Sequence, residues 1–191
     1  MNPILSEYLE KSTGLLRQIA ESEEQNLERA AEIIAEAYAA GHRIYVFGCT
    51  HSAILAEDVF YRAGAPVAVA ECALERGAEL ILLTSGNYKD QHGDHPRIAN
   101  LWSLRDRALV IDNHVPVGDA AVALDDACRM GPLSTIAGSF IMHSLSALAI
   151  RRLMDKGIDA PVFMSSNAPG GREKNEKLMN LQWVRDAFLL P

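Results

Sequence analysis

The chain has 191 residues, a mass of 20.9 kDa and a formal net charge of −7 at pH 7, and one hydrophobic core suits this length, so we predict a single domain over residues 1–191. The acidic balance argues against a general nucleic-acid surface. No apolar run reaches the length of a bilayer span and the N-terminus carries no signal-peptide pattern, so we expect a cytoplasmic protein with no membrane partner.

The first forty residues predict a long N-terminal helical segment. Apolar side chains recur at helical spacing across residues 4–40. The polar stretch 21–26 predicts a break, and Ser22 with Gln25 has the form of a capping box that starts a second helix. Gly41 predicts the end of the segment, because glycine readily adopts the left-handed conformation that closes a helix.

Apolar, β-branched runs then alternate with helical patterns. The expected elements are buried strands at 43–47, 79–85 and 107–113, a short edge strand at 121–124, an extended piece at 161–164, and helices at 52–63, 67–76, 131–156 and from the loop 165–171 to about 189. Strands that alternate with helices imply a parallel sheet covered on both faces. The predicted fold class is therefore α/β, a three-layer αβα sandwich.

Polar loops follow three of the predicted strands, at 48–52, 84–87 and 113–119. Ligands of parallel sheets bind beyond the carboxyl ends of the strands, so we expect these loops to line one crevice. In the first loop, the free amides of a helix start and the hydroxyls of Thr50 and Ser52 suit an anion such as phosphate. The plainer alternative is that this loop only caps its helix.

Several stretches of the chain together match one family pattern. They are residues 48–64 (GCTHSAILAEDVFYRAG), 83–85 (LTS), 110–120 (VIDNHVPVGDA), 131–138 (GPLSTIAG) and 167–176 (NAPGGREKNE). This series resembles a phosphosugar-binding bacterial subfamily of the SIS (sugar isomerase) domain, related to phosphoheptose isomerase, whose motifs read GTGHS, LAEEVFYRAGG, VIDNCVPPGDA, GPTSTVAG and NVPGG…HNE. The resemblance covers nearly the whole chain in the same order. It implies a SIS or flavodoxin-like fold and a dimer or tetramer.

One part of that pattern is missing. In the family, the YRAG helix leads into a further strand and a serine-rich, SNSG-type loop that grips the sugar phosphate. Here residues 61–64 are followed almost at once by residues 66–71 (PVAVAE), which resemble the helix after that loop. A strand and its loop are thus absent at Ala65–Pro66, through a deletion in the gene, through engineering, or because this sequence does not represent the segment. Losing a central strand exposes sheet edges and removes core.

The resemblance implies binding of a phosphorylated sugar and aldose–ketose isomerisation through an enediol. That chemistry needs a base, a group that shuttles the hydroxyl proton, and donors for the developing oxyanion. Glu57, on the helix after the first loop, is the candidate base, and His51 is the candidate assisting group. The alternatives are a surface carboxylate paired with Arg62 and a histidine that caps or packs.

A larger set of residues is expected to bind the ligand: Gly48, Thr50, Ser52, Thr84, Ser85, Asn113, Asp119, Asn175 and Glu176. Asn113 and Asp119 occur in a turn, where such side chains also bond local backbone. Asn175 and Glu176 could reach the pocket, including that of a neighbouring subunit. Alternatively they are ordinary residues at the start of a helix.

We expect no metal and no cofactor. His92 and His95 with His114 are weak evidence for a metal cluster, and the cysteines are too widely spaced for a zinc site. The helix at 131–156 is apolar on nearly every side, which favours a homo-oligomer. The alternative function is a non-catalytic, regulatory protein that senses a sugar phosphate. A third reading is a remnant that pairs with a fuller homologue.

Overall fold

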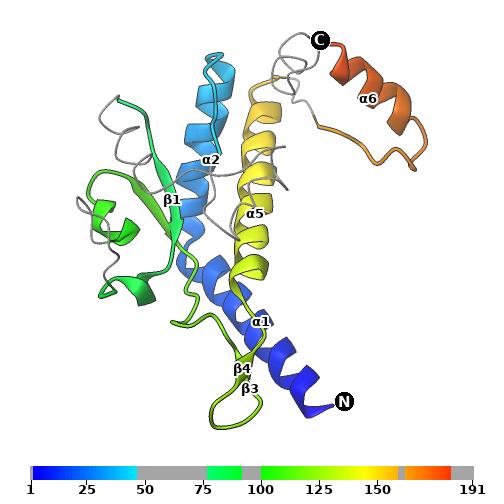
Figure 1. Ribbon diagram of the computed structural model, residues 1–191. Helices are drawn as coiled ribbons and strands as arrows, with labels where there is room; N and C mark the ends of the chain where they lie inside the picture. Colours follow the sequence, from blue (N-terminus) through cyan, green and yellow to red (C-terminus); the bar gives the residue numbers. More distant parts are fainter. Residues whose placement is uncertain (1, 47–76, 92–99, 159–161, 182–191) are drawn as a thin grey trace. The chain divides into compact units, whose positions relative to one another are not determined.

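The computed structural model describes residues 2–46, 77–91, 100–158 and 162–181 (Figure 1). The chain divides into two compact units, Met1–Arg152 and Leu153–Pro191, and each is described by itself. The predicted helices at 52–63 and 67–76 lie outside the described residues.

The chain begins with two consecutive helices, α1 (Pro3–Ser22) and α2 (Glu24–Ala39). The predicted break is confirmed, at Glu23. The expected capping box is wrong, because Glu23 is the N-cap of α2 and no side-chain cap bond forms there. The predicted stop at Gly41 is confirmed: this glycine has φ 73°, and its N–H donates to the carbonyl of Tyr38 at 3.0 Å.

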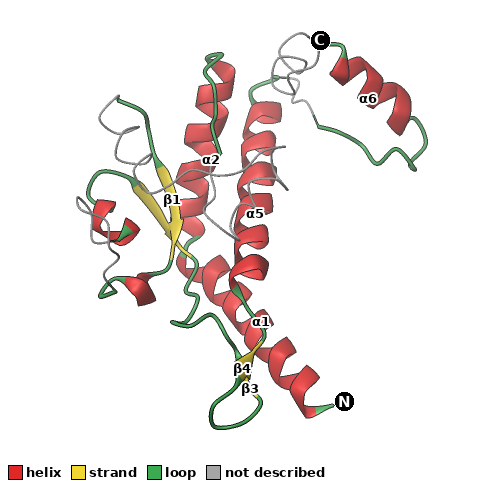
Figure 2. Cartoon of the chain, viewed as in Figure 1, coloured by secondary structure: helices red, strands yellow, loops and turns green. Residues whose placement is uncertain are grey.

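The described residues contain a parallel pair of strands, β1 (Ile81–Thr84) and β2 (Leu109–Asp112) (Figure 2). They confirm two predicted strands, with shorter bounds. Their register pairs Thr84 with Asp112, so both strands end at the same level. The expected strand at 43–47 is not seen, since residues 43–46 form no strand and residue 47 lies outside the described part. The protein is thus a mixed α/β fold, and the three-layer sandwich stays a prediction.

The loop after β1 contains a short 3-10 helix, η2 (Gly86–Tyr88), and a second one, η3 (Leu101–Leu104), precedes β2. After β2, the predicted edge strand is confirmed as β3 (Val122–Ala123). It pairs antiparallel with β4 (Arg129–Met130), which the sequence did not indicate because both residues of β4 are exposed.

The long apolar pattern forms α5 (Ser134–Asp155), which confirms the predicted helix. In the first unit its apolar face packs with residues of α1, α2 and β2 in one core. Ile19, Ile111 and Ile141 are fully buried there and come from three different elements. Burial of each such side chain stabilises the fold by about 1.5–3 kcal/mol. The core therefore fixes the break between α1 and α2 against the carboxyl end of β2.

The second unit contains the loop 165–170 and α6 (Gly171–Met179). Residues 162–164, predicted to be extended, form no strand. Gly170 has φ 76°, a conformation that favours glycine just before the helix starts. The side chain of Asn175 bonds the backbone of Met164 twice, accepting from its N–H at 2.9 Å and donating to its carbonyl at 2.7 Å.

Candidate functional site

The loops that follow β1 and β2 meet at one edge of the sheet. The N–H of Asn113 donates to the carbonyl of Thr84 at 2.9 Å, which extends the strand pairing by one step. Beyond it, the Asn87 amide donates to the carbonyls of His114 and Val115, at 3.1 Å each. Two of the three loops expected to converge, 84–87 and 113–119, therefore meet, and the third, 48–52, lies outside the described residues.

Ser85 and Asn113, both predicted to bind the ligand, form hydrogen bonds that shape these loops. The Ser85 hydroxyl donates to the Val115 carbonyl at 2.8 Å and accepts from the Asn87 N–H at 3.2 Å, and the residue is 5% exposed. The Asn113 side-chain oxygen accepts from the Val115 N–H at 3.1 Å. These bonds fit the local structural role that Asn and Ser play in turns, and contact of either side chain with a ligand stays a prediction.

Asp112 joins the two loops through one of its carboxylate oxygens. Its Oδ1 accepts from the N–H of Gly86 at 3.0 Å and from the N–H of His114 at 2.8 Å. A Cβ on Gly86 would lie 2.5 Å from Asp112 Oδ2, so a larger residue at this position would have to displace the carboxylate or the loop. The other oxygen, Oδ2, lies 3.5 Å from Nδ1 of the His114 ring.

A second carboxylate reaches this place from the helix break. Glu23 is 7% exposed, and its Oε2 accepts from the Asp112 N–H at 3.1 Å and from the Asn26 amide at 2.8 Å. Its other oxygen, Oε1, lies 3.7 Å from His114 Nε2. Buried carboxylates are rare unless they are paired, so this residue marks the cluster as a candidate site.

The His114 ring thus lies between two carboxylates. Its side chain is 19% exposed, against 9% for Glu23 and 15% for Asp112. Its Nε2 is 2.8 Å from the hydroxyl of Ser22, the last residue of α1. His114 has φ 51°, a left-handed backbone that is uncommon outside glycine and often accompanies functional sites.

Asp119 accepts hydrogen bonds at the start of α5. Its Oδ1 accepts from the N–H groups of Leu133 and Ser134 at 2.9 and 3.0 Å, and its Oδ2 accepts from the Ser134 hydroxyl at 2.5 Å. These bonds satisfy amides that a helix start leaves without an intrahelical partner. The carboxylate thereby ties the turn after β2 to α5.

Asn175 and Glu176 belong to the second unit. Asn175 is engaged with the backbone of Met164, as described above, and Glu176 is exposed on α6. Glu176 is the sixth residue of that helix, so it is not a first-turn residue. The notion that these two side chains complete a ligand pocket stays a prediction.

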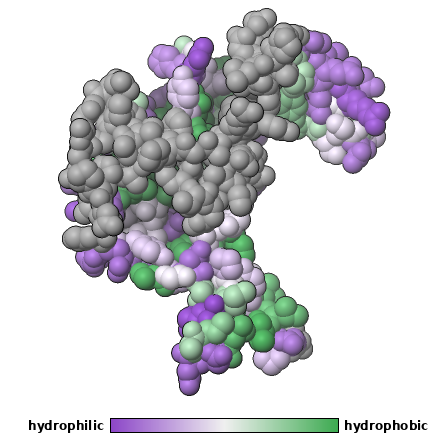
Figure 3. Space-filling model, in the orientation of Figure 1, coloured by the Kyte–Doolittle hydropathy of each residue, from purple (hydrophilic) through white to green (hydrophobic). Residues whose placement is uncertain are grey.

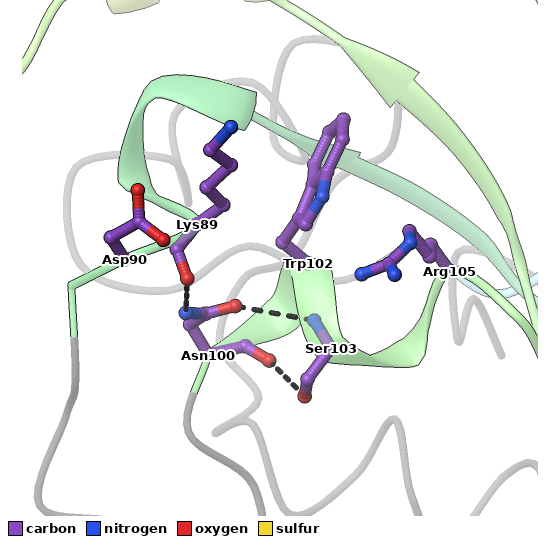
Figure 4. Close-up of a pocket in the computed structure, with 6 residues that line it drawn as sticks. All are labelled: Lys89, Asp90, Asn100, Trp102, Ser103 and Arg105. Atoms are coloured by element: carbon purple, nitrogen blue, oxygen red, sulfur yellow. Dashed lines mark hydrogen bonds between the residues drawn. The ribbon is translucent and has the colours of Figure 1, made fainter.

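Two cavities lie close to the same loops. One, of about 370 Å³, is lined by Lys89, Asp90, Asn100, Trp102, Ser103 and Arg105 (Figure 4). Asn100 holds its rim together by bonding the carbonyl of Lys89 and the N–H of Ser103. The other, of about 450 Å³, lies between α1 and the turn after β2, and its lining includes Lys11 and Arg129. Both cations donate to the carbonyl of Ala121, at 2.8 and 3.2 Å.

Several predicted site residues lie outside the described residues: Gly48, Thr50, His51, Ser52 and Glu57. His92 and His95 lie outside them too. Within the described part of the chain, no group of three or more His, Cys, Asp or Glu side chains is arranged to hold a metal ion. Cys128 is a free, exposed thiol there.

Sequence reasoning did not assign Ser22 and Glu23 to the site. The polar break between the two helices is the signal that the sequence carries at these positions, and it predicts a helix cap. For His114 the sequence suggests only a metal ligand. Its proximity to Ser22 and Glu23 depends on residues about ninety positions apart, which no local pattern reveals.

Comparison with known proteins defines the class of this chain. The family model of the SIS domain matches residues 7–78, which include the helix break with Ser22 and Glu23. The described helices and parallel strands agree with an α/β fold of this class. Such membership supports the binding of a phosphorylated sugar.

No helix in the described ranges has both the length and the apolarity that a membrane span requires.

Curated relatives define the family. A UPF0309 protein of Shouchella clausii is 31% identical to this chain, over 92% of this chain and 95% of its own length. UPF0309 proteins of Geobacillus kaustophilus and Lysinibacillus sphaericus are 30% and 26% identical, over 91% and 98% of this chain and 92% and 100% of their own lengths. The chain therefore belongs to the UPF0309 family of SIS-domain proteins.

The alignment with the Shouchella clausii protein also bears on length. It extends over 235 positions, whereas this chain has 191 residues, so the relative carries residues that have no counterpart here. The position of the missing segment at Ala65–Pro66 stays a prediction, because residues 47–76 lie outside the described part.

Proposed function

We propose that the protein binds a phosphorylated sugar at the carboxyl ends of its parallel strands and interconverts the aldose and ketose forms. The observation that carries this proposal is the meeting of the loops after β1 and β2, where Asp112, His114 and Glu23 gather at one edge of the sheet. Ligands of parallel sheets bind at that edge. Membership of the SIS-domain class supports a sugar phosphate as the ligand.

The proposed division of labour follows the sequence motifs. Glu57 is the base that removes the carbon-bound proton, and His51 assists it. The phosphate and the sugar hydroxyls meet backbone amides and hydroxyls of the residues Gly48, Thr50, Ser52, Thr84 and Ser85. No metal or cofactor is required by this scheme, because the enediol route transfers only protons.

Homo-oligomer formation is part of the proposal. Three apolar side chains in the first half of α1, Ile4, Leu5 and Leu9, are 50%, 62% and 53% exposed. Figure 3 shows hydrophobic colour gathered over this end of α1. Apolar patches of this kind normally meet a partner, and we propose a second copy of the chain, in the cytoplasm.

The test combines binding with turnover. The intact mass is measured first: a value near 20.9 kDa means that the chain itself lacks the second phosphate loop, and a larger value means that the protein carries it. The protein is then titrated calorimetrically with a panel of aldose and ketose phosphates, and products are followed by NMR. We expect one sugar phosphate to bind and to be isomerised, and the Glu57→Gln variant to bind it without turnover.

The outcomes separate the competing functions. Full turnover by the Glu57→Gln variant removes Glu57 from its role. Binding without turnover across the whole panel favours a regulatory, sugar-phosphate-sensing protein instead of an isomerase. A folded protein that binds none of the sugar phosphates contradicts both functions.

A further inference from the structure

The helix break and the end of β2 bring together a hydroxyl, an imidazole and two carboxylates. We propose that Ser22 and His114 form a proton-transfer pair that moves the hydroxyl proton of the bound sugar, with the carboxylates of Asp112 and Glu23 flanking the imidazole. This inference rests on the proposed isomerase function and deepens it. It assigns transfer of the hydroxyl proton to Ser22 and His114, which the sequence motifs did not place in the site, and it leaves His51 as the group that assists Glu57 at the carbon-bound proton.

The first argument is the way in which each carboxylate is used. Oδ1 of Asp112 accepts hydrogen bonds from two backbone N–H groups. Oε2 of Glu23 accepts hydrogen bonds from the Asp112 N–H and from the Asn26 amide. The remaining oxygen of each carboxylate faces the His114 ring, at 3.5 and 3.7 Å. Both carboxylates are therefore oriented by other bonds before the ring changes its protonation state, which is the preorganisation that proton transfer requires.

The second argument concerns the order of the groups. Ser22 Oγ is 2.8 Å from His114 Nε2, while Nδ1 of the same ring faces Asp112. A hydroxyl on one ring nitrogen and a carboxylate on the other is the arrangement in which an imidazole exchanges the hydroxyl proton and the carboxylate orients it. Because Ser22 is exposed and the ring is mostly buried, the hydroxyl is the part of the pair that a ligand can touch.

The third argument is that core packing by itself does not explain a histidine at position 114 beside two carboxylates. His114 has φ 51°, a backbone conformation that glycine adopts at no steric cost. Burying two carboxylates beside each other is unfavourable unless they are hydrogen-bonded or paired. A histidine here has a role if its ring relays a proton, because the ring nitrogens lie between the Ser22 hydroxyl and the two carboxylates.

The proton balance of the step is closed. As the base removes the carbon-bound proton, the carbonyl oxygen takes a proton from Ser22, which is resupplied from His114, and the enediol forms. As the enediol collapses, the neighbouring hydroxyl returns one proton to Ser22 and His114, and the base returns its proton to the other carbon. One O–H bond is made and one is broken. The pair ends in its starting protonation state, and no oxidant or reductant takes part.

Two variants test the pair in the full-length protein. Ser22→Ala removes a single exposed hydroxyl, and His114→Gly removes the ring at a position whose backbone suits glycine. For both we expect kcat for the sugar phosphate to fall by about 100- to 10,000-fold, as is typical for loss of general acid–base catalysis. The dissociation constant of the sugar phosphate should change less than about threefold, because the pair acts on protons that move after binding.

Chemical rescue separates a proton-transfer role from a structural one. The His114→Gly variant leaves space for a ring, so we expect added imidazole to restore at least a tenth of the lost turnover. 1,2,4-Triazole has the same size and is much less basic, so it should not restore turnover. Equal rescue by both compounds would mean that the ring only fills space, and it would overturn the proposal.

The control is His42→Gly, which removes an exposed histidine just after α2 and should leave kcat unchanged. Turnover by the unaltered protein tests the proposed isomerase function, whereas the ratio of variant to unaltered kcat tests the pair. Wild-type kcat in both Ser22→Ala and His114→Gly would overturn this inference and leave the isomerase intact. A lack of turnover in the unaltered protein would overturn the isomerase function and this inference with it.

Discussion

The buried carboxylate of Glu23 accepts a hydrogen bond from the backbone N–H of Asp112, 3.1 Å away and separated by 89 positions in the chain. This bond joins the break between α1 and α2 to the last residue of β2. The same carboxylate faces His114, so one side chain both docks the helices on the sheet and lines the candidate site. Substitutions of Glu23 are therefore expected to lower the free energy of unfolding in addition to any effect on the site.

We expect Glu23→Ala to lower the free energy of unfolding by about 1–3 kcal/mol, because it leaves the Asp112 N–H and the Asn26 amide without their acceptor. Urea denaturation followed by circular dichroism measures the change. Glu23→Gln keeps an acceptor oxygen and should cost less than Glu23→Ala. The exposed neighbour Glu21 is the control, since Glu21→Ala should stay within about 0.5 kcal/mol of the unaltered protein. Equal effects at positions 21 and 23 would contradict this account.

Gly86 offers a second test. A Cβ there would meet Asp112 Oδ2 at 2.5 Å and Trp102 Cη2 at 3.2 Å, so Gly86→Ala must displace the carboxylate or the loop. We expect a loss of about 1–3 kcal/mol, as for other overpacked sites, together with a fall in turnover.

Gly14 supplies the matched control for that substitution. It lies inside α1, and a Cβ there would meet nothing within 4 Å. Gly14→Ala should therefore stabilise the protein by about 0.5–1 kcal/mol, because alanine loses less backbone entropy in a helix. Thermal unfolding of the two alanine variants should move in opposite directions, and a shift in the same direction would refute the steric argument.

Asp119 was expected to bind sugar hydroxyls, and the structure gives its carboxylate three bonds at the start of α5. We expect Asp119→Ala to destabilise the protein by about 1–2 kcal/mol through loss of this cap. Asp119→Asn, which keeps one acceptor and tolerates φ 47°, should cost less. The exposed Asp126 is the control. An Asp119→Asn variant with normal stability and weakened sugar-phosphate binding would instead assign the carboxylate to the ligand.

The apolar end of α1 leads to a prediction on assembly. Leu5 and Leu9 are 62% and 53% exposed, and a charge there would oppose burial against a second copy. The double variant Leu5→Glu, Leu9→Glu should therefore show a lower molar mass by light scattering than the unaltered protein at the same concentration. A monomeric mass for the unaltered protein at micromolar concentration would remove the proposed oligomer.

Much of the local structure followed from the sequence. Helical spacing predicted α1, α2 and α5, and the polar stretch 21–26 predicted the break between the first two helices. Apolar, β-branched runs predicted β1 and β2 because those strands lie in the core. Strand β4 was missed, since two exposed residues form no periodic pattern.

The sequence by itself determined the periodic elements and the SIS-domain resemblance, because both depend on residues close together or in a fixed order along the chain. Only the tertiary structure decided that Ser22, Glu23 and His114 share one site, and that Asp119 caps α5. Those relationships join side chains across 92 positions in one case and 15 in another. They arise because the core packs α1, β2 and α5 together, and the hydrogen bonds form only where that packing brings donors and acceptors within reach.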